Sequence, residues 1–284
     1  MSYKYISKAD EEKPYDSNGV SFVRMTIDDD FKELDEYGIE WYRVNLKSGA
    51  TYSPKLESNK VVLLMFNGKR AYINNCGQIF DVKEPAVFIP DFDKYYYFVG
   101  AIEDTEFMMG LVNMNDWDWS RYNRSHKHLP FFNCCSMATE YGQSCKLEGT
   151  HSWTLLQGMQ LGHLTIGACR AIGSGTHENG HPSQQQWNYI VGNSDFNLLV
   201  KNNESMANPV PGLENTVSVP QLPGDFSLIY AGCDHDLIAQ PNKEVFYLWA
   251  ETYTVQDCSQ YWEAIISNKT PSEAYEATVK MGLK

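Results

Sequence analysis

Two glycine-framed stretches carry the residues best suited to chemistry. Residues 173–192 read GSGTHENGHPSQQQWNYIVG, and residues 224–235 read GDFSLIYAGCDH. Because alternate residues of a strand point to one face, Asn179 and His181 share a face. We expect Gln185 and His235 to meet them from neighbouring strands. Imidazoles and amides that converge in this way can bind a divalent metal or hydrogen-bond a polar ligand.

The spacing of these residues resembles the two motifs of the cupin superfamily. In the first stretch, Asn179 and His181 stand at the His-x-His positions of that family and Gln185 at its Glu position. In the second stretch, His235 stands at the last histidine position. The resemblance covers residues 40–255 and implies a site in a barrel mouth, where a divalent transition metal (Zn, Mn, Fe or Ni) is held by these positions.

Two of the four positions depart from the family pattern, since Asn179 replaces a histidine and Gln185 replaces a glutamate. Loss of an imidazole and a carboxylate weakens metal binding. His177 lies on the inward face by parity, and a bulge at Asn179-Gly180 would bring it closer to His181. The sequence therefore predicts metal ligands from His177, His181, Gln185 and His235. The alternative is a metal-free barrel whose polar groups hydrogen-bond a ligand directly.

Aromatic residues are expected along the wall of the same site. By strand alternation, Trp187 and Tyr189 fall on the face predicted to point inward. Tyr230 and Trp249 are further candidates, because aromatic rings stack on sugars and close pockets. We predict that these four side chains bind substrate together with Asn179. The other interpretation of each aromatic residue is barrel core.

The sequence assigns no catalytic base. Asp234 and Asp236 flank His235, so strict alternation turns both of them away from the site. Glu251 shares a face with Trp249, and we interpret it as a solvated residue at the barrel rim.

Two β-rich blocks of similar length and order predict an all-β protein with two tandem cupin (jelly-roll) β-barrels and a short C-terminal helical tail. Asn67-Gly68 is expected to form a hairpin turn in the first block. That block has no histidine before residue 126, which indicates a structural or dimer-forming barrel without metal ligands. The predicted boundaries are an N-terminal arm at 1–35, barrels at 36–115 and 149–254, a linker at 116–148 and the helical tail at 255–284.

The two-barrel layout narrows the resemblance. Residues 34–73 are similar to the first barrel of 5-deoxyglucuronate and 5-keto-4-deoxyuronate isomerases, and residues 224–251 resemble their closing segment. This similarity implies metal-assisted aldose–ketose interconversion of an acidic sugar in the second barrel. Ureidoglycine aminohydrolases are another two-barrel group, and their mixed ligand set includes an amide.

Charge and composition restrict the partners. A net charge of -13 disfavours nucleic acid and anionic membranes, because both would repel the protein. The chain contains no apolar segment of the ~20 residues that a membrane span needs. Seven cysteines without zinc-type pairs predict reduced thiols and a cytoplasmic location. We expect a small-molecule substrate, and the duplicated barrel makes a homodimer reasonable.

Three functions remain open at this point. The first is a metal-dependent isomerase for a sugar or sugar acid. The second is an enzyme of the ureidoglycine aminohydrolase or lyase type. The third is a non-catalytic protein that binds a small molecule at a degenerate metal site.

Overall fold

The computed structural model describes residues 3–9, 11–25, 39–55, 60–91, 95–125, 128–135, 139–140, 151–173, 176–178, 184–201, 216–229 and 233–253. Asn179, His181, Tyr230 and the predicted helical tail lie outside these residues. Within the described ranges, the chain forms antiparallel β-strands and a single helix, α1 (Asp116–Ser125).

The first barrel consists of two facing antiparallel sheets. The larger sheet has the strand order β11 (Phe131–Cys134), β8 (Pro85–Ile89), β5 (Lys60–Asn67), β10 (Thr105–Asn113), β3 (Ile39–Leu46), β2 (Val20–Arg24). The smaller sheet has the order β4 (Thr51–Tyr52), β9 (Tyr97–Ala101), β6 (Ala71–Asn75), β7 (Gln78–Val82).

The second barrel repeats this plan. Its larger sheet has the order β1 (Tyr3–Ser7), β19 (Phe226–Ile229), β16 (Gln184–Ile190), β21 (Glu244–Tyr253), β14 (Leu164–Ile172), β13 (His151–Leu161), β12 (Thr139–Glu140). Its smaller sheet has the order β15 (Thr176–Glu178), β20 (Asp234–Ala239), β17 (Phe196–Lys201), β18 (Thr216–Gln221).

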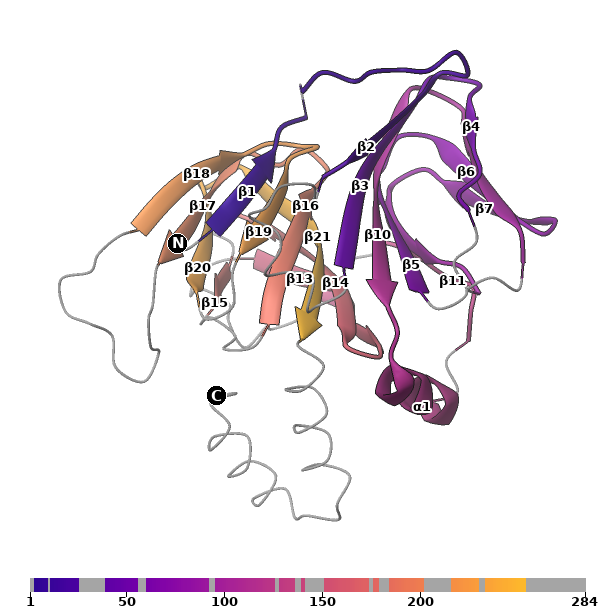
Figure 1. Ribbon diagram of the computed structural model, residues 1–284. Helices are drawn as coiled ribbons and strands as arrows, with labels where there is room; N and C mark the ends of the chain where they lie inside the picture. Colours follow the sequence, from indigo (N-terminus) through magenta and orange to yellow (C-terminus); the bar gives the residue numbers. More distant parts are fainter. Residues whose placement is uncertain are drawn as a thin grey trace.

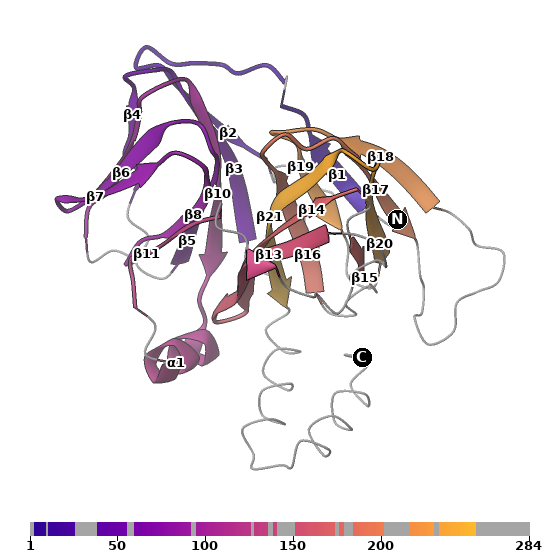
Figure 2. The same cartoon turned by 180° about the vertical axis from the view of Figure 1, so that it is seen from behind.

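The two barrels lie side by side, with their larger sheets facing each other (Figures 1 and 2). In both views, β3 and β10 of the first barrel lie next to β16 and β21 of the second. The prediction of an all-β protein with two tandem jelly-roll barrels is therefore confirmed.

The prediction of a hairpin at Asn67-Gly68 is wrong. β5 pairs with β10 and β8 in the larger sheet, whereas β6 pairs with β7 and β9 in the smaller one. The turn carries the chain from one sheet to the other. Gly68 has φ +95°, and a Cβ there would lie 2.7 Å from Pro85 Cδ. Asn-Gly fixes a tight turn, but it does not decide which strands pair. The partner of each strand depends on how side chains pack across the whole barrel.

The N-terminal arm joins both barrels. β1 adds to the second barrel by pairing with β19, and β2 pairs with β3 of the first. Between these strands, the buried Arg43 side chain donates hydrogen bonds to the carbonyl oxygens of Ser7 and Lys8 in the arm. It also donates one of 2.9 Å to the carbonyl oxygen of Gly224 in the second barrel. One guanidinium therefore holds three segments that are distant in sequence.

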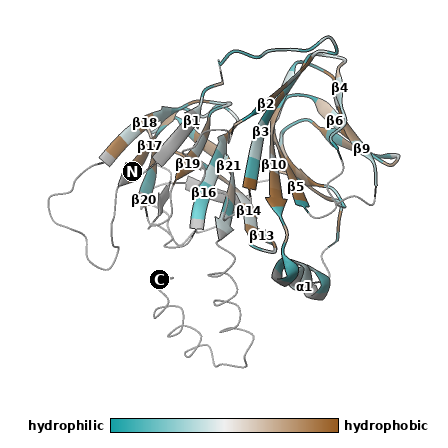
Figure 3. Ribbon diagram, viewed as in Figure 1, coloured by the Kyte–Doolittle hydropathy of each residue, from teal (hydrophilic) through white to brown (hydrophobic). Residues whose placement is uncertain are grey.

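A hydrophobic core between the barrels complements the core inside each one. At its centre, the fully buried Trp41 of β3 lies 5.7 Å from Trp187 and 4.9 Å from Phe226, measured between ring centroids. Gly110 makes room for this indole, because a Cβ at that position would lie 2.9 Å from Trp41 Cζ3. Figure 3 shows hydrophobic residues on β10 and β5 and mostly hydrophilic colouring on α1.

Helix α1 falls in the segment that the sequence presents as a linker. The Asn115 side chain caps its start by accepting the Asp118 N–H at 3.0 Å. Asp118 is fully buried and lies 2.8 Å from His163 Nδ1, in the turn between β13 and β14. This contact fixes the segment between the barrels to the second barrel. No helix in the described part of the chain is long and apolar enough to cross a membrane.

We expect Trp41→Ala to lower the free energy of unfolding by about 3–5 kcal/mol, because it empties the centre of the inter-barrel core. Phe22→Ala is the matched control, since Phe22 lies on the adjacent strand and is 44% exposed. The control should cost about 1 kcal/mol or less. Urea unfolding followed by circular dichroism measures both changes. Equal losses would show that the inter-barrel core contributes little to stability.

Candidate functional site

Strand β16 has one apolar face and one polar face. The apolar face packs in the core between the barrels, and the polar face points into the second barrel. Trp187 pairs with Ala250 of β21, and both belong to the core between the barrels. Asn188 pairs with Trp249, which packs against the interior core of the second barrel. Directly opposed residues of antiparallel strands share a face. Gln186 and Asn188 therefore line the interior of the second barrel.

The predicted inward orientation of Trp187 and Tyr189 is wrong. Both side chains are fully buried between the barrels. The ring of Trp187 stacks on Phe226 at a centroid distance of 5.4 Å. The Tyr189 hydroxyl donates a 3.0 Å hydrogen bond to Glu106 of the first barrel. Burial, with the Glu106 carboxylate close by, raises the pKa of Tyr189, so the hydroxyl keeps its proton.

The predicted inward orientation of Gln185 is also wrong. It pairs with Thr252, one step along β21 from Glu251, and so shares the face of Trp187 and Ala250. Gln185 is buried, but on the side of β16 away from the interior of the second barrel. The motif spacing predicts that Gln185 and His235 converge, but the register of β16 separates them.

The inner wall of the second barrel contains buried polar groups with unused hydrogen-bonding capacity. Gln186 Nε2 donates a 3.1 Å hydrogen bond to Asn188 Oδ1. Among the described residues, Gln186 Oε1, Asn188 Nδ2 and the hydroxyl of Ser227 have no hydrogen-bond partner. Ser227 pairs directly with Asn188, so the three atoms share one wall. A buried polar atom without a partner costs about 1–3 kcal/mol, which a bound ligand or water can offset.

His235 occupies the opposite wall of this barrel. It pairs with Val200, a member of the interior core, and its side chain is 2% exposed. Its Nδ1 lies 3.1 Å from the carbonyl oxygen of Cys233. Because a carbonyl only accepts, this bond puts the proton on Nδ1 and the lone pair of the neutral ring on Nε2. The inward position agrees with the sequence analysis, and a ligand role for His235 stays a prediction.

The register of β15 changes which of its residues belong beside His235. Glu178 pairs with His235, whereas His177 pairs with Asp236. The backbone therefore places position 178 on the inner face, and position 177 on the face of Asp236. The predicted parity of His177 is wrong for this reason. Its side chain lies outside the described part of the structure, so its role as a ligand stays a prediction.

Trp249 and Glu251 continue the inner wall along β21. The indole of Trp249 covers Gly167 of β14 so closely that a Cβ there would lie 2.1 Å from Trp249 Cζ2. Glu251 is the register partner of both Gln186 and Thr165. It is only 9% exposed, which corrects its interpretation as a solvated rim residue. The second barrel therefore holds a buried carboxylate, which is suited to proton transfer.

The donor types fit a divalent metal in part. His235 has the backbone-supported Nδ1 that is usual for a metal-binding imidazole, and Glu178 is its register partner. Within the described ranges, no group of three His, Cys, Asp or Glu side chains is placed to hold a metal. Two of the predicted positions, Asn179 and His181, lie outside those ranges. The interior of the first barrel is filled instead by apolar side chains such as Leu64, Phe66 and Phe107.

Sequence reasoning missed Gln186, Asn188 and position 178, and it placed Glu251 at the solvated rim, whereas Glu251 is buried. The alternation Gln-Trp-Asn-Tyr-Ile at residues 186–190 was the available signal. It shows that β16 has two unlike faces, but not which of them faces the barrel interior. In a protein with one barrel, the apolar face would point inward.

Comparison with known proteins shows similarity at the level of fold. No protein-family model and no curated protein sequence matches the chain. The oxalate decarboxylase of Lactobacillus farciminis, solved as a formate complex, matches with a TM-score of 0.58 and 10% identity over 96% of each chain. Protein Ylba of E. coli matches with a TM-score of 0.60 and 11% identity, over 88% of this chain and 90% of that one.

A third match is vicilin from hazelnut, Corylus avellana, with a TM-score of 0.56 and 10% identity. It covers 88% of this chain and 86% of that one. The chain has the two-barrel cupin fold. At these identities, the similarity does not extend to activity.

We expect Ser227→Ala to leave the free energy of unfolding unchanged or to raise it by up to about 1 kcal/mol, because it removes an unpartnered hydroxyl. Ser194→Ala is the matched control. The Ser194 hydroxyl lies 2.7 Å from the Val191 carbonyl oxygen and accepts the Phe246 N–H at 2.9 Å. The control should lose about 1–2 kcal/mol in urea unfolding. A similar loss in both variants would mean that Ser227 is satisfied in solution.

Proposed function

We propose that the protein binds a small polar metabolite inside its second barrel and acts on it as a metal-dependent enzyme. The observation that carries this proposal is the polar inner wall of β16. Gln186 Oε1, Asn188 Nδ2 and Ser227 Oγ are buried without hydrogen-bond partners among the described residues. Together they offer donors and an acceptor to a carboxylate or hydroxyl group. The formate complex of an oxalate decarboxylase with this fold supports a small carboxylate as ligand class.

In this proposal, His235, His181 and Glu178 would hold the metal, and the bound metal would supply Lewis acidity that polarises a carbonyl or hydroxyl group. Gln186 and Asn188 orient the substrate through hydrogen bonds, and Trp249 forms an apolar wall beside them. Glu251 exchanges the proton of an adjacent C–H group. These roles are those of an isomerase for a sugar or sugar acid, which is the finer form of the proposal.

Non-catalytic binding is the second candidate. It is favoured by the neutral character of Gln186 and Asn188, because amides recognise a polar ligand without changing its protonation. Metal content and proton exchange separate the two candidates.

We expect His235→Ala to reduce bound transition metal by about tenfold or more, because it removes a nitrogen ligand. His128→Ala is the control, since His128 is an exposed histidine of the segment between α1 and β11 and belongs to neither sheet of this barrel. Elemental analysis after supplementation with Zn, Mn, Fe and Ni measures the content of each variant. Unchanged metal in His235→Ala would remove His235 from the site, and a wild-type protein without metal would leave only the binding function.

Glu251→Gln should lower the rate of substrate proton exchange by about 10²- to 10⁴-fold, because it removes a general base without changing shape. Nuclear magnetic resonance in D₂O, with a panel of uronic acids and ketoses, measures this exchange. Asp236→Asn is the control, because position 236 lies on the outer face of β20. This variant should exchange the substrate proton as fast as wild type. If Glu251→Gln exchanges as fast as wild type, another group is the base.

A further inference from the structure

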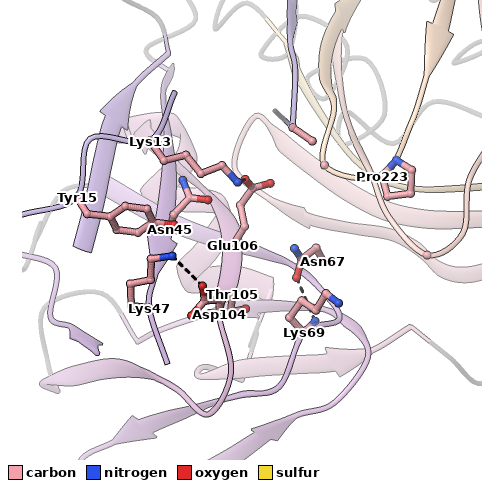
Figure 4. Close-up of a pocket in the computed structure, with 13 residues that line it drawn as sticks. Lys13, Tyr15, Asn45, Lys47, Asn67, Lys69, Asp104, Thr105, Glu106 and Pro223 are labelled. Carbon is pink, nitrogen blue, oxygen red and sulfur yellow. Dashed lines mark hydrogen bonds and ion pairs between the residues drawn. The ribbon is translucent and has the colours of Figure 1, made fainter. Parts of the chain in front are cut away.

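A cavity lies between the two barrels, at the end where the N-terminal arm crosses them. Its volume is about 520 Å³, which is in the range of small-molecule sites. The arm contributes Lys13 and Tyr15, and the first barrel contributes the ends of β3 and β10. Gly192 and Pro223–Gly224 of the second barrel close the other side. Figure 4 shows these side chains around the space.

Positive charge gathers in this cavity although the whole chain is acidic. Three lysines line it, together with two carboxylates. Lys13 pairs with Glu106 at 3.1 Å, and Lys47 pairs with Asp104 at 2.9 Å. The hydrogen bond from Lys47 lowers the pKa of Asp104, so this pair stays ionised and neutral overall. Among the described residues, Lys69 makes no ion pair, so the cavity keeps one uncompensated positive charge.

Buried polar side chains complete the lining. Asn45 is 2% exposed and Thr105 is 4% exposed, and both line the cavity. Asn45 Nδ2 and Thr105 Oγ1 have no hydrogen-bond partner among the described residues. Asn67 uses its Oδ1 to accept the Lys69 N–H at 3.1 Å, which leaves its amide group available as a donor. The lining therefore offers more donors than acceptors.

We propose that this cavity binds a small metabolite through one anionic group, a phosphate or a carboxylate. Lys69 provides the charge, and the side-chain amides of Asn67 and Asn45 provide hydrogen bonds. The cavity is larger than inorganic phosphate, so the rest of the ligand lies toward the ring of Tyr15. The residues that line this cavity include none of the polar residues assigned above to the interior of the second barrel.

The position of the cavity gives the bound anion a structural effect. The ligand touches the arm, the first barrel and the second barrel at once. A ligand that binds only the assembled form stabilises it by mass action. We therefore expect anion binding to raise the midpoint of thermal unfolding.

The test is titration with inorganic phosphate and, separately, with malonate, at an ionic strength held constant with chloride. Calorimetry should show saturable binding with a Kd on the order of millimolar for one of the two anions. Lys69→Gln should weaken it about tenfold, because it removes the charged donor. Lys83→Gln is the matched control, since Lys83 is an exposed lysine of the same barrel outside the cavity, and it should bind as wild type does.

Each outcome decides the proposal. Tighter binding of phosphate identifies a phosphorylated ligand, and tighter binding of malonate identifies a carboxylated one. Absence of saturable binding of both anions overturns the proposal, as does equal binding by Lys69→Gln and wild type. Equal weakening in Lys69→Gln and Lys83→Gln would also overturn it, because it would indicate non-specific attraction. His235→Ala should bind the anion normally, so failure of the metal site would not affect this result.

Discussion

The burial of one face of β16 against the first barrel is the constraint on which the candidate site depends. On this face, Trp187 packs against Trp41, and the Tyr189 hydroxyl donates a hydrogen bond to Glu106. Because neighbouring residues of a strand alternate in direction, this contact turns Gln186 and Asn188 into the second barrel. The polar interior therefore exists because the barrels are docked, and a change in docking would alter the site without touching its residues.

Charged groups in the same interface determine how the arm and the barrels fit together. Arg43 is 3% exposed and binds carbonyl oxygens of the arm and of the loop before β19. Glu106 lies 4.0 Å from its Nε and also pairs with Lys13. A buried charge is tolerated only when it is paired and hydrogen-bonded, so these contacts specify one arrangement of the segments. The cavity that Lys69 lines is formed by that arrangement.

The two barrels have the same architecture and unlike interiors. The first is filled by aliphatic and aromatic side chains, which suits a stable support. The second combines an apolar end with a band of polar residues that includes Gln186, Asn188 and Glu251. A polar band inside a barrel lowers stability, and proteins keep such groups where a ligand compensates for them. This difference supports the proposal that the first barrel is a support and the second holds the site.

The sequence by itself determined the all-β architecture, the duplication and the inward position of His235, because strand periodicity and turn residues are local properties. Only the tertiary structure decided the facing of Gln185, Trp187 and His177, since alternation defines two faces of a strand without saying what covers each. The pairing of β1 with β19 and the cavity beside Lys69 likewise join residues that are distant in the chain. Contacts of this kind depend on how the two barrels pack together, and no local pattern encodes them.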